Sequence, residues 1–174
     1  MKNRHAATLA AAALLALPAL AHQPDIPADT PPEYIGECGS CHVAYPAALL
    51  SESDWRDIMR GLDKHYGDNA SLGEETRQKI EEFLARNAEP HWKAHFPSGD
   101  PPRLTATIWY RVHHHELPDN IFQDKRVGSA SNCAACHVKA EKQLFDKTDL
   151  TEVPADYGLV EKKSATQPQA AGSN

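Results

Sequence analysis

Two segments that share the pattern Cys-x-x-Cys-His constrain this chain more than any other feature. The first spans Cys38 to His42 and the second spans Cys133 to His137. The chain has four cysteines, so these two segments contain all of them. A Cys-x-x-Cys pair alone also occurs in redox disulfides and in half-sites for zinc. The histidine that directly follows each pair makes the pattern much more specific.

The N-terminus has the parts of a secretory signal peptide. A positively charged start precedes an Ala/Leu run at residues 6–17, and Ala-Leu-Ala at residues 19–21 is a small-residue cleavage site. We expect residues 1–21 to be removed, so that the mature chain begins at His22 in the periplasm. An uncleaved anchor is the less favoured alternative, because a membrane span needs roughly 20 apolar residues.

The charge of the mature chain excludes one class of partner. The full chain has 18 basic and 24 acidic residues, and loss of Lys2 and Arg4 with the signal peptide leaves 18 − 2 = 16 basic residues. Such an acidic chain does not fit nucleic acid binding, and it is compatible with steering towards a basic patch on another protein. We expect no membrane span after signal cleavage, since no later stretch is long and apolar enough.

In an oxidising compartment four cysteines would normally indicate two disulfides, but the spacing here predicts two covalently attached haem c groups. In a Cys-x-x-Cys-His segment the two thiols reach both vinyl groups of one haem, and the adjacent histidine ligates the iron from the proximal side. The predicted attachment residues are Cys38, Cys41, Cys133 and Cys136. The predicted proximal ligands are His42 and His137. A zinc site built from all four cysteines is the alternative. It is less favoured, because four cysteines would complete such a site and the histidine after each pair would have no purpose.

Helical periodicity predicts a mainly α fold. Trp55, Ile58, Met59 and Leu62 form an apolar stripe at helical spacing, and Ser71 begins a capping-box pattern before a second stripe. The predicted helices are residues 33–37, 52–66, 73–87, 105–116 and 138–146.

A proline-rich segment from residue 88 to 102 predicts a boundary between two small haem-binding domains, in which haem replaces part of each core. The tail turns to Ser, Ala, Gln and Gly, which is typical of disorder. The predicted organisation is a signal peptide at 1–21, an N-terminal haem domain at 22–95, a C-terminal haem domain at 96–163 and a disordered tail at 164–174.

The sixth ligand decides whether a haem only transfers electrons or also binds small molecules. Once Met1 is cleaved, Met59 is the only methionine, and it lies on an apolar face where a packed core methionine is expected. We therefore expect histidine ligands at both irons. His65, at the edge of the first stripe, is the expected distal ligand of the first haem. A solvent-facing histidine near a helix C-terminus is the alternative for His65.

The second haem has several possible distal ligands. The candidates are His113, His114 and His115, with His91 and His95 further away in the proline-rich segment. Neighbouring residues on a helix point roughly 100° apart, so only one of the three consecutive histidines is expected to face the iron. Measured against the apolar stripe of Leu104, Ile108 and Val112, His115 lies closest to the buried face.

These residues together resemble the bacterial dihaem cytochrome c family known as DHC. The matching segments are residues 38–46, 55–72, 103–116 and 132–137. The resemblance implies an N-terminal domain similar to class I cytochrome c, a less usual C-terminal haem domain, and irons of low potential with two histidine ligands each. It also implies redox partner proteins, namely a small oxygen-binding c-type haem protein that receives electrons and a membrane cytochrome b that supplies them.

The resemblance implies His65 as the first distal ligand, in agreement with the reading above. In the second domain the family pattern is an aromatic pair, three residues, His, any residue and Glu, which aligns Trp109-Tyr110 with His114 and Glu116. This conflicts with the periodicity argument. We follow the resemblance and expect His114 as the ligand, with His115 as the runner-up.

The sequence therefore predicts a low-potential periplasmic electron carrier rather than an enzyme. A dihaem peroxidase or small-ligand-binding sensor with one open iron is the main alternative, with a spare histidine at 91, 95, 113 or 115 as its acid or base. The chain is short for that architecture. A third reading treats the histidine triplet as a metal-binding tract of a storage or chaperone protein.

Overall fold

The computed structural model describes residues 26–89 and 99–160. The predicted signal peptide, the predicted tail at 164–174, and His91 and His95 lie outside these residues. Within the described part the regular structure is helical, and the extended pairing is limited to isolated bridges. The prediction of a mainly α fold is confirmed.

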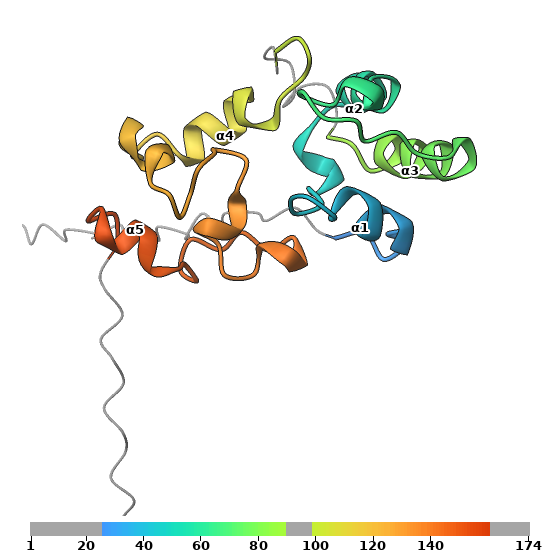
Figure 1. The fold of residues 1–174 in the computed structure, drawn as a ribbon. Helices are drawn as coiled ribbons and strands as arrows, with labels where there is room; N and C mark the ends of the chain where they lie inside the picture. Colours follow the sequence, from blue (N-terminus) through green and yellow to red (C-terminus); the bar gives the residue numbers. More distant parts are fainter. Residues whose placement is uncertain (1–25, 90–98, 161–174) are drawn as a thin grey trace, which may run out of the picture.

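Short helices connected by turns make up the described part (Figure 1). The α-helices are α1 (Pro32–Cys38), α2 (Glu52–Arg60), α3 (Glu74–Arg86), α4 (Ile108–His113) and α5 (Glu152–Asp156). The 3-10 helices are η1 (Ala47–Leu49), η2 (Leu62–Lys64), η3 (Leu104–Ala106), η4 (Asp119–Gln123), η5 (Cys133–Ala135) and η6 (Ala140–Lys142). In Figure 1, α1, α2 and α3 gather at one end of the molecule, and α4 and α5 lie towards the other.

Helix α2 begins as predicted but ends earlier than predicted. Its N-cap is Ser51, whose side chain accepts a hydrogen bond from the backbone N–H of Asp54 at 3.1 Å. The α-helix ends at Arg60, and Gly61 is its C-cap. The N–H of Gly61 donates to the carbonyls of both Asp57 and Ile58. The chain continues as η2, and His65 caps that short helix instead of lying inside a longer one.

Helix α3 confirms the predicted helix at 73–87 to within a residue at each end. The predicted capping box at its start is wrong, since the N-cap is Gly73 and no side chain caps the helix. The backbone N–H of Ser71 instead donates a hydrogen bond to the side-chain Oδ1 of Asn69 at 2.9 Å. The side chain of Asn69 therefore stabilises the turn before the helix, and the Ser71 side chain does not cap the helix.

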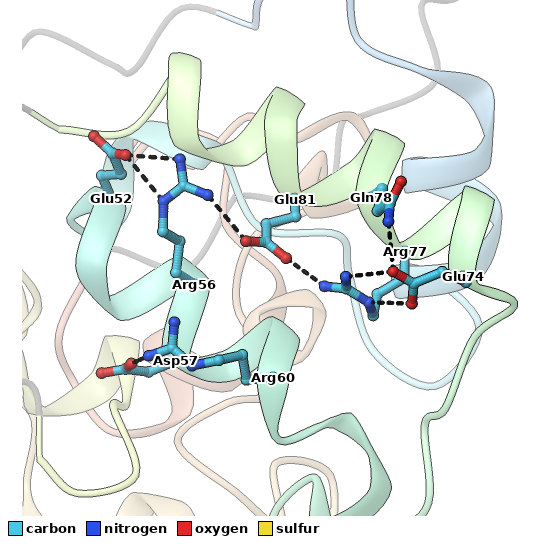
Figure 2. Close-up of polar contacts among 8 residues, drawn as sticks. All are labelled: Glu52, Arg56, Asp57, Arg60, Glu74, Arg77, Gln78 and Glu81. Atoms are coloured by element: carbon cyan, nitrogen blue, oxygen red, sulfur yellow. Dashed lines mark hydrogen bonds and ion pairs between the residues drawn. The ribbon is translucent and has the colours of Figure 1, made fainter.

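Charged side chains link α2 to α3 (Figure 2). Arg56 of α2 donates to Glu81 of α3 at 2.9 Å, and Glu81 also accepts from Arg77 within α3. Arg77 in turn donates to Glu74 at 2.9 Å, in the first turn of α3. The ion pairs therefore run along α3 and cross to α2 at Glu81.

Two separate hydrophobic clusters lie in the described part. The first lies among α1, α2 and α3 and contains Tyr34, Ala44, Ala47, Leu49, Leu50, Trp55, Met59, Leu62, Ile80, Phe83, Leu84 and Leu104. The second contains Ile121, Val127 and Val153. Leu104 follows the proline-rich segment, yet it lies in the first cluster, and Trp109 and Tyr110 pack against that cluster. The C-terminal half therefore contributes to the N-terminal core.

The remaining predicted helices are shorter in the structure. The predicted helix at 105–116 is divided into η3 and α4, with Thr107 as the N-cap of α4 and His114 as its C-cap. The predicted helix at 138–146 is wrong, because only η6 forms there before Gln143 adopts a left-handed conformation with φ of 56°. None of the helices in the described ranges is long and apolar enough to cross a membrane.

Candidate functional site

All four cysteines lie within the described residues, and all are free thiols. Cys38 ends α1, and Cys133 begins η5. Burial raises the pKa of both thiols to about 11, so they remain protonated near neutral pH.

The first Cys-x-x-Cys-His segment brings His42 opposite His65. The centroids of the two imidazole rings are 6.2 Å apart, and the ring planes differ by 21°. The Nδ1 atom of His42 lies 2.8 Å from the carbonyl oxygen of Val43. His65 is held at the end of η2, where the N–H of Asp68 donates to its carbonyl at 3.1 Å.

The second segment brings His137 opposite His114. Their ring centroids are also 6.2 Å apart, but these planes are nearly perpendicular, at 85°. The Nδ1 atom of His114 lies 2.9 Å from the carbonyl oxygen of Tyr110, one helical turn earlier. His114 is half-buried, whereas its neighbours His113 and His115 are exposed. His114 is therefore the member of the triplet that faces His137.

Both ring separations fit two imidazoles on opposite sides of one iron. With a metal–nitrogen bond of about 2 Å and about 1.1 Å from nitrogen to ring centre, the two centroids would lie about 6.2 Å apart. A carbonyl near Nδ1 holds the proton on that atom, which leaves Nε2 free to bind a metal. The residues present thus fit a six-coordinate haem iron at each site.

Burial favours the neutral imidazole at His65, His114 and His137. Burial lowers the pKa of His65, and the nearby His42 lowers it further. Burial also lowers the pKa values of His114 and His137. The neutral ring is the form that binds iron, so these environments keep the rings ready for coordination.

Tyrosine rings lie against a histidine of each pair. Tyr45 stacks on His42 with centroids 4.8 Å apart, and Tyr110 stacks on His114 with centroids 4.1 Å apart. Sequence analysis linked Tyr110 to His114 through the family pattern, but it gave Tyr45 no role. The available signal was the position of Tyr45, three residues after the histidine of the first motif.

The other candidate residues do not join these pairs. Met59 is 2 % exposed and lies in the first hydrophobic cluster, as predicted for a core methionine. His113 stacks on Trp109, and His115 lies 3.9 Å from the carboxylate of Glu116. Among the described residues there is no group of three or more His, Cys, Asp or Glu side chains that could hold a metal ion.

Comparison with known proteins decides the family. Residues 34–145, more than half of the chain, match the family described as dihaem cytochrome c. The chain belongs to the dihaem cytochrome c family. The resemblance inferred from the sequence is confirmed, and the comparison with curated proteins finds no match.

Two crystal structures of dihaem cytochromes c are similar to this chain. The dihaem cytochrome c of Shewanella baltica is 40% identical, with a TM-score of 0.59, and the match covers 68% of this chain and 89% of that one. The DHC purified from Rhodobacter sphaeroides is 41% identical, with a TM-score of 0.56, and the match covers 67% of this chain and 97% of that one.

Membership of the dihaem cytochrome c family implies two covalently bound haem c groups, as the sequence predicted. The four cysteines at 38, 41, 133 and 136 fit the two attachment motifs. Dihaem cytochromes c are typically electron carriers with redox partners, and bacterial c-type cytochromes are usually periplasmic.

Proposed function

We propose that this dihaem cytochrome c is a low-potential periplasmic electron carrier whose irons each have two histidine ligands. His42 and His65 would hold the first iron, and His137 and His114 the second. When bound, each haem supplies a one-electron couple between ferric and ferrous iron. The cysteines attach each haem, so that the cofactor is retained in the periplasm.

The ring separation of 6.2 Å in both histidine pairs is the observation that carries this proposal. Two imidazoles holding one iron would leave no open position on the metal for a small ligand. Replacing a methionine ligand by a second histidine also lowers the reduction potential of the haem, since Met/His ligation is the arrangement that raises it. The burial of Met59 in the first core supports this choice of ligands.

Backbone carbonyls orient two of the four proposed ligand rings. The carbonyls of Val43 and Tyr110 accept from Nδ1 of His42 and His114, which fixes the tautomer and the direction of each ring. Rings held in this way would need little rearrangement when an electron arrives or leaves. This suits an electron carrier better than a catalyst.

The proposal includes export and partners. The signal-peptide pattern at residues 1–21 supports a periplasmic location after cleavage. We propose that a membrane cytochrome b supplies electrons and that a small oxygen-binding c-type haem protein receives them. The acidic mature chain suits partners with basic docking patches.

The test is visible and EPR spectroscopy of the purified holoprotein, as isolated and after dithionite. We expect two low-spin haems in the unmutated protein. His65→Ala should convert one haem to high spin, and His114→Ala should convert the other. His113→Ala and His115→Ala are the matched controls, and both should remain low spin because both side chains are exposed and contact Trp109 and Glu116 instead.

Two outcomes would contradict the proposal. A high-spin haem in the unmutated protein that binds carbon monoxide or cyanide readily would favour a peroxidase or a sensor. Conversion by His115→Ala with no change in His114→Ala would move the second distal ligand by one position. Potentiometric titration of the unmutated protein should give two one-electron steps, both below the range of His/Met cytochromes c.

A further inference from the structure

The residues that follow the family-matched region fold back onto the second attachment motif. That region ends at residue 145, and we call residues 146–159 the C-terminal clasp. The clasp contains α5 and pairs with the motif in an antiparallel bridge between His137 and Leu150. The expected proximal ligand of the second haem therefore lies in backbone contact with a segment that the family match does not include.

Thr151 joins the clasp to the residues just before His137. Its hydroxyl donates a hydrogen bond to the carbonyl of Ala135 at 2.6 Å, and its N–H donates to the carbonyl of Cys136 at 2.9 Å. The same hydroxyl oxygen accepts from the N–H of Val153 at 3.3 Å, so Thr151 is also the N-cap of α5. One residue thus fixes two consecutive carbonyls of the motif and the start of α5.

The clasp also holds the residues just after His137. The N–H of Val138 donates to the carbonyl of Asp149 at 3.2 Å. The ammonium of Lys139 pairs with the carboxylate of Asp149 at 2.8 Å. Bonds to the clasp therefore flank His137 on both sides, which limits how far its backbone can move.

Packing fixes the clasp itself to the C-terminal half. Val153 of α5 is 6 % exposed and belongs to the second hydrophobic cluster, against which Cys136 also packs. Arg126 pairs with Asp156 of α5 at 2.7 Å. The clasp is thus anchored by a buried apolar side chain and by an ion pair, and its bonds to the motif start from a fixed base.

We propose that the C-terminal clasp sets the orientation of the His137 imidazole on the second haem iron, with Thr151 as the positioning residue. Thr151 acts through the backbone and not as a ligand, because a side chain in a fixed rotamer turns with the backbone that carries it. Groups behind a metal ligand commonly orient it in this way. This inference rests on the proposed function, since it takes His137 as an iron ligand.

The first motif offers a comparison. There the Nδ1 atom of His42 lies 2.8 Å from the carbonyl of Val43, the next residue in the chain. At the second motif the bond from Thr151 comes from 16 positions further along the chain than its acceptor. The orientation of the second ligand can therefore be altered without a change in either attachment motif.

The experiment is EPR of the oxidised holoprotein at liquid-helium temperature. The ring planes of His114 and His137 are 85° apart, and near-perpendicular planes give the largest g anisotropy. We therefore expect Thr151→Val, which loses the hydroxyl, to lower the largest g value of the signal that His114→Ala removes. The signal of the first site should stay unchanged. Thr151→Ser keeps the hydroxyl and should restore the unmutated g value.

Thr30→Val is the matched control. The hydroxyl of Thr30 also donates to a backbone carbonyl at 2.6 Å, that of Pro27, but it lies before α1 and outside the clasp. The variant removes the same chemical group from a bond of the same length, so both EPR signals should keep their g values.

A second variant tests the other side of His137. Lys139→Glu places a second carboxylate beside Asp149, and the repulsion should lower the same g value. Lys142→Glu makes the same change of charge on an exposed residue of η6 and should have no effect.

An unchanged second-site signal in both Thr151→Val and Lys139→Glu would overturn the inference, and so would an equal shift in Thr30→Val. If Thr151→Val fails to load the second haem, the comparison of Lys139→Glu with Lys142→Glu decides alone. Failure of the proposed function is visible separately, as a high-spin haem in the unmutated protein.

Discussion

The angle between paired imidazole rings differs between the two sites. The planes of His42 and His65 are 21° apart, whereas those of His114 and His137 are 85° apart. Near-parallel ligand planes split the iron d orbitals more strongly than near-perpendicular planes, because each ring donates most in one direction. If the proposed ligands are correct, the two irons should differ in electronic structure although their ligand types are the same.

We therefore expect two different low-spin EPR signals in the ferric protein. The site with perpendicular rings should give the larger g anisotropy, and His114→Ala should remove that signal. His65→Ala should instead remove the more rhombic signal of the first site. EPR at liquid-helium temperature measures both, and two superimposable low-spin signals in the unmutated protein would show that the ring angles are alike.

A substitution of Met59 tests whether methionine is a ligand of either iron. Because it is buried in the first core and stands apart from both histidine pairs, Met59→Leu should leave both haem spectra unchanged. The swap conserves volume, so we expect a loss of less than about 1.5 kcal/mol in the free energy of unfolding. Visible and near-infrared spectra and a denaturant titration measure the two quantities. A change in either haem spectrum would point to methionine ligation.

At the scale of elements, α2 and α3 form a pair in which an apolar face and a charged edge act together. Ile80, Phe83 and Leu84 of α3 are fully buried against the first core. The charged edge runs from Glu74 through Arg77 and Glu81 to Arg56 of α2 (Figure 2). Exposed ion pairs contribute little individually, but a network shares each charge among several partners.

The charged edge predicts a pH dependence of stability. The hydrogen bond from Arg77, and then that from Gln78, lowers the pKa of Glu74 from 4.5 to about 2. A carboxylate with a lowered pKa in the folded state stabilises the fold above the unfolded value and loses that effect as pH falls towards the folded value. Arg77→Gln should therefore be less stable than the unmutated protein above about pH 4.5, and the difference should shrink towards pH 2.

Denaturant titrations at several pH values measure this difference. Arg60→Gln is the control, because Arg60 pairs with Asp57 within α2 and takes no part in the link to α3. The difference for Arg77→Gln should also become smaller at high salt, since the carboxylate of Glu74 is exposed to solvent. A difference that stays constant with pH would show that Glu74 and Arg77 do not interact in solution.

At the scale of the whole molecule, the two halves share a core across the proline-rich segment. Leu104 is 8 % exposed and belongs to the first cluster, although it follows that segment in the chain. Further contacts come from Tyr45 to Ser131 and from Tyr66 to Pro102, and the guanidinium of Arg103 lies 4.5 Å from the Tyr66 ring centre. These contacts would limit independent motion of the two predicted haem domains.

Leu104→Ala should consequently destabilise the N-terminal half. Truncation of a buried leucine typically costs about 2–5 kcal/mol in the free energy of unfolding. Leu144→Ala is the control, since Leu144 is 36 % exposed and the loss should be much smaller. Chemical unfolding followed by the absorbance of the first haem and by tryptophan fluorescence measures the effect. An unchanged midpoint in Leu104→Ala would mean that the halves are stabilised independently.

Local sequence determined much of this protein. The two attachment motifs, the helix at α3, the N-cap of α2 and the core position of Met59 all follow from spacings of a few residues. Such patterns are readable because motif chemistry and helix periodicity depend on neighbours along the chain. The same spacing arguments failed where α2 ends early, at Gly61, and where Gln143 adopts a left-handed conformation.

Tertiary structure decided which side chains meet. Helical periodicity favoured His115, but α4 ends at His113, so His114 lies at the cap and turns towards His137. The contact between Tyr45 and Ser131 joins residues 86 positions apart, and no local sequence pattern predicts it. The physical reason is that packing of the two halves on a shared core brings such residues together, and a one-dimensional spacing contains no information about that packing.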